Sequence, residues 1–388
     1  MLINEMPLPA EPEYKFDLIA PKERIIFFDI ETTGLGISKA NIYLIGAVFY
    51  DGGRWMLRQF FAEGMYDEAK LLTGFFGLLN ERKKLGRLFL ISYNGDGFDI
   101  PFIKGCIRQY ALDFDFSGTM SIDLMKRIRP YRKLAGLENC KLKTVEKLCG
   151  IYREDRYNGG ELIYVYEEYL RLASLDKESC EYNENNLRLK DALFKTLILH
   201  NAEDIMDMPM IMNILGYESM MNGDFAVMRS CIENGVWDIE ARLDTPLPKG
   251  IYYEDKYFTI SIAEENDRLI SIAVSLYDGE LKSFYADYKS YYYLPGEDCA
   301  IHKSLGEFVD RKARRQATAR TCYQRVTGLF APEYEAVFAP MFYKEYKEMP
   351  AFGLLDGKNT DESGNVDAAA AKRYIMMLLA RLAKQDND

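Results

Sequence analysis

The sequence predicts an α/β protein in which a mixed sheet flanked by helices is followed by a smaller α+β domain. Two observations support this prediction. Apolar runs bounded by turn residues follow one another closely between residues 24 and 64, which is typical of consecutive antiparallel strands. A segment with helical spacing of apolar residues, 67–84, then leads into the apolar run 87–95. A helix followed by a buried strand indicates a sheet that helices cover.

The first half of the chain opens with three predicted strands. They are expected at 24–31, 41–53 and 54–64, and the second ends in Asp51-Gly52-Gly53, a hairpin signal. Apolar residues recur at helical spacing in four segments, 67–84, 99–112, 142–151 and 191–217, which predicts four helices. Pro209 lies within the last of them and favours a kink there.

The second half of the chain has a different texture. Strand-like runs are expected at 256–263 and 268–288, the latter split by a turn at Asp278-Gly279, and they predict a small antiparallel sheet. A basic helix is expected at 305–326, and a closing helix with Asp367 as its N-cap. We therefore divide the chain into a leader, 1–20, a first domain, 21–216, a connecting segment, 217–238, and a C-terminal domain, 239–388.

Composition limits the classes of protein that fit. The net charge of -11 argues against a protein that coats nucleic acid by bulk positive charge. Two basic islands stand out: residues 126–147 hold eight basic and two acidic residues, and residues 301–330 hold seven and two. The seven cysteines are scattered and form no CxxC pair, which favours free thiols. The sequence contains no apolar run long enough to predict a membrane-spanning helix. We therefore expect a cytoplasmic protein. Asp123 is expected to be a structural or capping acid.

Acidic residues stand where the predicted elements end. Asp29 and Glu31 are two residues apart at the end of the first strand, so alternation sends both side chains to one face, where they repel each other. Asp99 follows the strand at 87–95 in a loop that enters a helix. His200 and Asp204 are four residues apart and share one helical face.

Four carboxylates gathered from a strand, a loop and a helix need a compensating positive charge. Two divalent cations about 3.5 to 4 Å apart would supply it, and this arrangement serves phosphodiester hydrolysis. Oxygen ligands favour Mg²⁺ or Mn²⁺ over Zn²⁺. His200 is then a candidate to take the proton of the attacking water.

Three stretches of the sequence carry a family resemblance. FFDIETTGL, NGDGFDIP and HNAED resemble the three motifs of the DEDD (DnaQ-like) 3′-5′ exonucleases, which have a ribonuclease-H-like fold. SIDLMKRIR and LKTVEKLCGI are most similar to the YprB-type ribonuclease-H-like group. The resemblance covers about residues 20–216. Three residues separate His200 from Asp204, the spacing of the tyrosine subclass, so His200 stands at the tyrosine position.

The resemblance implies roles for particular residues. Asp29, Glu31, Asp99 and Asp204 would bind the metal ions, and His200 would be the general base. The pocket for the terminal nucleotide would be lined by Thr32, Thr33, Gly34 and Leu35, with Asn94 and Phe98 nearby.

These features together predict a metal-dependent 3′-5′ exonuclease acting on single-stranded DNA or RNA. Arg314 and Arg315, on one stripe of the basic helix with Arg311, Arg325 and Tyr323, would hold the strand, although a helix that only covers a core has the same pattern. Two other functions stay open: a nucleic-acid-binding module with little turnover, and a structural or assembly protein that acts through its C-terminal domain. Protein partners are unknown.

Overall fold

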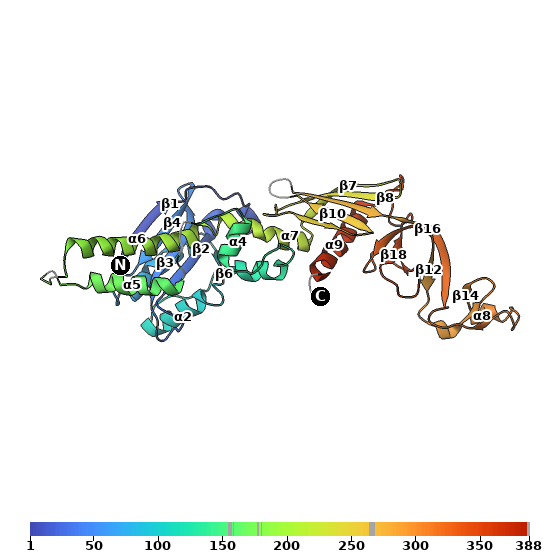
Figure 1. The fold of residues 1–388 in the computed structure, drawn as a ribbon, viewed down its shortest axis with the longest axis horizontal. Helices are drawn as coiled ribbons and strands as arrows, with labels where there is room; N and C mark the ends of the chain where they lie inside the picture. The colour runs from blue at the N-terminus through green and yellow to red at the C-terminus, as the bar shows by residue number, and fades with distance from the viewer. Residues whose placement is uncertain (154–156, 158, 177, 180, 264–267, 386–388) are drawn as a thin grey trace. The chain divides into compact units, whose positions relative to one another are not determined.

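The computed structural model describes residues 1–153, 157, 159–176, 178–179, 181–263 and 268–385 (Figure 1). Contacts within the chain divide it into two compact units. Unit 1 comprises residues 1–132 and 136–215, and unit 2 comprises residues 133–135 and 216–388.

Unit 1 contains a mixed six-stranded sheet in the order β1-β4-β3-β2-β5-β6. Its strands β1 to β4 pair antiparallel, whereas β2 pairs parallel with β5 and β5 with β6. The sheet confirms the predicted fold class. Its strands are β1 (Leu2–Pro7), β2 (Ile25–Thr32), β3 (Ile42–Asp51), β4 (Arg54–Phe61), β5 (Leu88–Ser92) and β6 (Thr119–Asp123).

The predicted leader is wrong for its first residues. Strand β1 lies within 1–20 and pairs residue by residue with β4, from Leu2 opposite Phe61 to Pro7 opposite Met56. This pairing satisfies backbone groups that would otherwise line an open sheet edge. The prolines that follow β1 made the whole segment resemble an irregular leader, but only Pro7 falls within the strand, at its last position.

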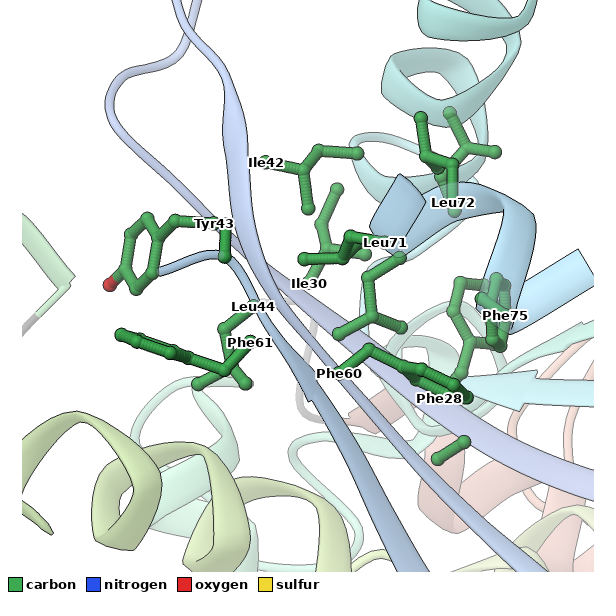
Figure 2. Packing of buried hydrophobic residues seen from close by; sticks show 14 of the residues in the cluster. Phe28, Ile30, Ile42, Tyr43, Leu44, Phe60, Phe61, Leu71, Leu72 and Phe75 are labelled. Carbon is green, nitrogen blue, oxygen red and sulfur yellow. The ribbon is translucent and has the colours of Figure 1, made fainter. Parts of the chain in front are cut away.

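Strand β2 is buried on both faces, which explains its nearly continuous apolar sequence. Figure 2 shows Phe28 and Ile30 among the buried side chains that include Leu71 and Phe75 of the helix α1. The alternate residue Phe27 faces the other way, 5.8 Å from the ring of Trp55. Each such side chain contributes roughly 1.5 to 3 kcal/mol to the free energy of unfolding when it is fully buried. The packing therefore holds the strand that carries Asp29 and Glu31 in a fixed position.

Helices flank the sheet as the sequence predicts. Helix α6 contacts β2, β3 and β4, and α1 contacts β3, β4 and β5. The helix predicted at 191–217 ends early: α6 stops at Met206, Pro209 precedes a 3-10 turn at Met210–Ile214, and α7 follows. The helices up to this point are α1 (Glu68–Lys83), α2 (Asp99–Tyr110), α3 (Leu124–Ile128), α4 (Leu142–Leu148), α5 (Gly159–Ala173), α6 (Glu184–Met206) and α7 (Leu215–Asn222).

The described residues of unit 2 form three antiparallel sheets. The first has the order β7-β8-β11-β10-β9, the second β12-β16-β18-β17 and the third β14-β13-β15. The strands of the first sheet are β7 (Phe225–Glu233), β8 (Val236–Leu243), β9 (Ile251–Glu254), β10 (Phe258–Ile262) and β11 (Leu269–Ser275). Those of the other two are β12 (Tyr277–Phe284), β13 (Tyr291–Leu294), β14 (Cys299–His302), β15 (Arg315–Gln316), β16 (Tyr323–Glu333), β17 (Met341–Phe342) and β18 (Ala351–Leu354).

Two local predictions for this half differ from the structure. Residues 217–238, taken as a connecting segment, contain most of α7, all of β7 and the start of β8. The turn predicted at Asp278-Gly279 is wrong, because both residues lie inside β12, where Gly279 pairs with Gly328 of β16. The break between β11 and β12 falls at residue 276 instead.

The basic helix predicted at 305–326 is also wrong. The segment contains the end of a short helix, α8 (Lys303–Gly306), then β15, and then the start of β16. Arg315 and Gln316 pair with Tyr293 and Tyr292 of β13, and the side chain of Gln316 donates to the carbonyl of Tyr291. Sheet pairing therefore outweighs helical propensity here, and the arginines do not form a helical stripe.

The closing helix is confirmed. Helix α9 (Ala368–Gln385) begins after Asp367, whose carboxylate accepts hydrogen bonds from the backbone N–H groups of Ala369 and Ala370, each at 2.9 Å. Tyr374 of α9 packs against Trp237 of β8, with ring centroids 4.7 Å apart. The helix thus anchors to the first sheet of unit 2.

Two further expectations concern cysteines and membranes. Six cysteines lie in described residues and are free thiols, whereas Cys180 lies outside the described residues. Among the described helices, none has the length and apolar character needed to cross a bilayer.

Unit 2 contains a buried carboxyl group, Glu333, at the end of β16. Its side chain is fully buried; Oε2 accepts hydrogen bonds from the N–H groups of Val337 and Phe338, and Oε1 has no hydrogen-bond partner among the described residues. Burial raises the pKa of Glu333 from 4.5 to about 7, against the lowering effect of those two N–H groups. The folded state therefore favours the neutral acid.

We predict that Glu333→Gln stabilises the protein at alkaline pH. Because the pKa of Glu333 is higher in the folded state, its contribution to the free energy of unfolding is fully present below the pKa of the unfolded state. This contribution is lost as pH rises to about 7, and the loss is about 3 kcal/mol. Thermal unfolding at about pH 5 and about pH 8 should show a much larger gain for Glu333→Gln at the higher pH. Glu335→Gln is the control, because that side chain is 62% exposed. An equal gain at both pH values would contradict the assignment.

Candidate active site

The site is built on β2 and on the helix α6 that crosses it. Asp29 and Glu31 both point toward α6: the side chain of Asn201 donates to Asp29 Oδ2 at 3.3 Å, and His200 Nε2 lies 3.5 Å from Glu31 Oε1. The alternation of the strand therefore places both carboxylates on one face, as predicted from their spacing. Ile30 between them joins the hydrophobic core.

The helical spacing of His200 and Asp204 brings them together as predicted. His200 Nε2 lies 3.4 Å from Asp204 Oδ2, one turn further along α6. Ligand atoms of Glu31, His200 and Asp204 all lie within 4.8 Å of one another. Their side chains are 12%, 6% and 19% exposed, so the cluster is nearly enclosed but still reachable from solvent.

Asp99 is the first residue of α2 and is 4% exposed. Its Oδ1 accepts a hydrogen bond from the backbone N–H of Ile30 at 3.0 Å, beyond the point where β2 ceases to pair with β5. This contact ties the start of α2 to the strand that carries Asp29 and Glu31. Asp99 thereby joins the other predicted acids.

The loop before α2 is held by Asp123, whose predicted capping role is confirmed. Asp123 accepts hydrogen bonds from the N–H groups of Met125 and Lys126 at the start of α3. The same carboxylate accepts from the N–H of Asn94, at 2.9 Å. Asn94 adopts a positive φ of 65°, so this predicted site residue helps to shape the loop that leads into Asp99.

Negative charge accumulates around Asp29. Burial raises the pKa of Asp29 well above its usual range, and repulsion from Asp99, Glu31 and Asp204 raises it further. Burial raises the pKa of Asp99 to about 7, although the N–H of Ile30 opposes this shift. The acids therefore lie close enough to resist simultaneous ionisation, which is the condition that a bound cation relieves. Their oxygen-rich donor set suits Mg²⁺ or Mn²⁺.

An ion pair that the sequence analysis missed borders this cluster. Arg153 is 5% exposed; its Nε donates to Glu146 of α4 at 2.6 Å, and its Nη1 donates to Asp204. Attraction to these two carboxylates outweighs burial and raises the pKa of Arg153, so its charge is secure. Glu146 stands alone among apolar residues on one face of the predicted helix 142–151, and this pattern could have indicated the ion pair, because a buried carboxylate requires a partner.

The residues predicted to line a nucleotide pocket follow Glu31 directly. Thr32 donates to the carbonyl of Gly34 at 2.8 Å, and the Thr33 hydroxyl accepts from the N–H of Asn41 at 2.9 Å, so both shape the turn. Leu35 is 87% exposed. Thr33 also lines a cavity of about 220 Å³ together with residues of β3, α1 and α5.

Three other predicted substrate residues differ in position: Phe98 directly precedes Asp99, whereas Arg314 and Arg315 are far from it in the sequence. Phe98, the N-cap residue of α2, packs against Phe102 of that helix, with ring centroids 5.6 Å apart. Arg314 and Arg315 belong to unit 2. Arg314 donates to the carbonyl of Gly306 and stacks on Tyr292, whereas Arg315 is exposed and lies 5.0 Å from the ring centroid of Tyr293.

Comparison with known families agrees with this architecture. Residues 26–216 match the family model of the RNase_H superfamily. No curated protein matches the chain. The match and the mixed sheet flanked by helices give these residues an RNase H-like fold. This superfamily usually hydrolyses nucleic acids and typically uses divalent metals, so the fold indicates a nucleic-acid-processing nuclease.

We predict that Mn²⁺ or Mg²⁺ raises the melting temperature, more at about pH 8 than at about pH 6. The raised pKa values of Asp29 and Asp99 mean that protons compete with the cation at the lower pH. At 100 times its Kd a cation stabilises by about 2.7 kcal/mol. Differential scanning fluorimetry of the wild type and of an Asp29→Ala, Asp204→Ala double variant measures this. An equal shift in the variant would exclude the site.

Proposed function

We propose that this protein is a metal-dependent 3′-5′ exonuclease that hydrolyses single-stranded DNA or RNA, resembling the DEDD enzymes of the YprB type. The observation that carries the proposal is the convergence of Asp29, Glu31, Asp99 and Asp204 with His200 in an RNase H-like fold. These residues come from a strand, a helix start and a helix interior. Their convergence supports a common catalytic role.

The acids would hold two divalent cations. Asp29 has the other three carboxylates as neighbours and is therefore the best candidate to contact both ions. The bound ions would activate a water molecule and neutralise charge on the phosphate. The protein contributes preorganised ligands, since β2 is buried in the core and Asp99 is tied to Ile30.

His200 is proposed as the general base. Its Nε2 faces Glu31 and Asp204, and its side chain is only 6% exposed, so the imidazole is held at the cluster. In this position it would accept the proton of the attacking water. Its phase on α6 relative to Asp204 places it beside the acids despite the spacing of the tyrosine subclass.

The exposed turn after Glu31 is proposed to receive the terminal nucleotide. Leu35 presents an apolar side chain to solvent. Thr33, which follows Glu31 closely in the sequence, lines a cavity. An exposed apolar side chain so soon after Glu31 in the chain would offer a surface for the face of a base. We further propose that exposed arginines of unit 2, among them Arg311 and Arg315, bind the single-stranded nucleic acid. Arg314 is proposed to have a structural role, because it donates to the carbonyl of Gly306.

The decisive test is digestion of matched 5′-labelled single-stranded DNA and RNA with Mn²⁺ or Mg²⁺. The wild type should produce a ladder that shortens from the 3′ end, and Asp29→Ala should not. Asp113→Ala is the matched control, because Asp113 is an exposed acid of the same unit. Internal cuts would overturn the exonuclease assignment. Metal binding without cleavage would favour the nucleic-acid-binding module with little turnover. The structural or assembly protein would be favoured if the protein's function in the cell survives Asp29→Ala but is lost when residues 217–388 are deleted.

We predict that His200→Ala slows hydrolysis by roughly 10² or more. The expected cause is loss of a proton acceptor, so added imidazole should restore part of the rate. Single-turnover kinetics at saturating Mn²⁺ measure the effect, and a Mn²⁺ titration of the variant checks that the metal is still bound. A rate near that of the wild type would remove His200 from the mechanism.

Replacing Arg311 and Arg315 together with Glu should weaken binding of single-stranded oligonucleotides. Fewer phosphate contacts release fewer counterions, so the dependence of log Kd on log salt should also flatten. Fluorescence anisotropy over a salt series provides both quantities. Arg373→Glu serves as the control, since Arg373 is an exposed arginine of α9 in the same unit. An unchanged salt slope would return these arginines to a solvated surface.

A further inference from the structure

We propose that Asn201 is a positioning residue that orients the Asp29 carboxylate and is itself held by a relay of side-chain amides. The relay consists of Asn4, Gln59 and Asn201. The inference deepens the proposed function and rests on the metal site proposed there. Asn201 lies within the HNAED motif, where the resemblance implies no role for it, and Asn4 and Gln59 lie outside the motifs.

The relay follows one row of the sheet. Asn4 of β1 lies opposite Gln59 of β4, Gln59 lies opposite Gly46 of β3, and Gly46 lies opposite Asp29 of β2. The row would be broken at Gly46, which has no side chain. Asn201 of α6 fills this gap, because a Cβ added to Gly46 would lie 2.4 Å from Asn201 Oδ1.

One backbone carbonyl determines the direction of every hydrogen bond in the relay. The carbonyl of Ile198 can only accept, and Gln59 Nε2 lies 2.9 Å from it, so this end of the Gln59 amide must be the donor. Gln59 Nε2 also donates to Asn201 Oδ1 at 3.0 Å, while Gln59 Oε1 accepts from Asn4 at 3.0 Å. A flipped amide would set two acceptors or two donors against each other.

The consequence falls on Asp29. Because Asn201 Oδ1 is committed to Gln59, its Nδ2 must face Asp29 Oδ2, and the two atoms are 3.3 Å apart. Asn201 and Gln59 are both fully buried. Neither amide can exchange its partner for bulk water without local opening, so the donor that faces Asp29 is permanent.

A permanent donor matters because Asp29 is surrounded by charges of its own sign. Repulsion from Asp99, Glu31 and Asp204 would otherwise turn the carboxylate away or leave its orientation variable. A hydrogen bond to one oxygen holds the group in place and leaves the other oxygen directed elsewhere. Such partners behind metal-binding groups typically change metal affinity or activity 10- to 100-fold.

The test is the Mn²⁺ affinity of Asn201→Leu, measured by isothermal titration calorimetry. Leucine keeps the approximate size of asparagine but cannot donate, so we expect affinity to fall by about 10- to 100-fold. Asn185→Leu is the control, because Asn185 is exposed on the same helix. Unchanged affinity in Asn201→Leu overturns this inference alone, whereas a wild type that binds no Mn²⁺ overturns the metal site and the inference together.

A double-mutant cycle separates positioning from a general structural role. If Asn201 acts through the Asp29 carboxylate, Asn201→Leu should have little further effect on Mn²⁺ affinity in an Asp29→Asn background. Equal losses in both backgrounds would show that Asn201 only supports packing. In hydrolysis, kcat should fall while KM for the oligonucleotide stays near that of the wild type; a rise in KM alone would contradict the assignment.

Gly46→Ala reaches the relay by a different route and covers the case in which Asn201→Leu fails to fold. The added methyl group would displace Asn201 without changing any hydrogen-bonding side chain. We expect a loss of Mn²⁺ affinity in the same direction. Gly77→Ala is the matched control, because a Cβ there has no atom within 4 Å. Wild-type affinity in Gly46→Ala would overturn the requirement for a fixed Asn201.

Discussion

Repulsion among buried carboxylates is the constraint around which unit 1 is organised. Asp29 has Asp99, Glu31 and Asp204 as neighbours, and burial adds to the cost of ionising it. Carboxylates that perturb one another in this way cluster at functional sites. The surrounding contacts are best understood as ways of holding these acids in place before a cation compensates them.

The fold meets this constraint with rigid elements and backbone donors. Strand β2 is anchored by aromatic and aliphatic packing, and Asp99 is fixed by the N–H of Ile30. Arg153 brings a permanent positive charge to Asp204 and is itself held by Glu146. These contacts separate two tasks, since carboxylates supply charge while amides, backbone groups and an ion pair supply orientation.

Unit 2 shows how charge patterns mislead when tertiary pairing is unknown. The arginines between Arg311 and Arg325 have spacings close to a helical stripe, yet Arg315 pairs with β13 and Arg325 lies in β16. Arg314 stacks on Tyr292 and donates to the carbonyl of Gly306, so this side chain also stabilises the fold, and its contact with nucleic acid stays a prediction. Exposure, which sequence does not record, separates it from Arg315.

The sequence by itself determined the parts that depend on local periodicity. Alternation placed Asp29 and Glu31 on one face, helical phase paired His200 with Asp204, and Asp123 and Asp367 were recognisable caps. Tertiary structure alone decided what depends on register between distant strands. Strand β1, the amide relay and the pairing of Arg153 with Asp204 have no local signature, because their partners meet only once the sheet and α6 have assembled.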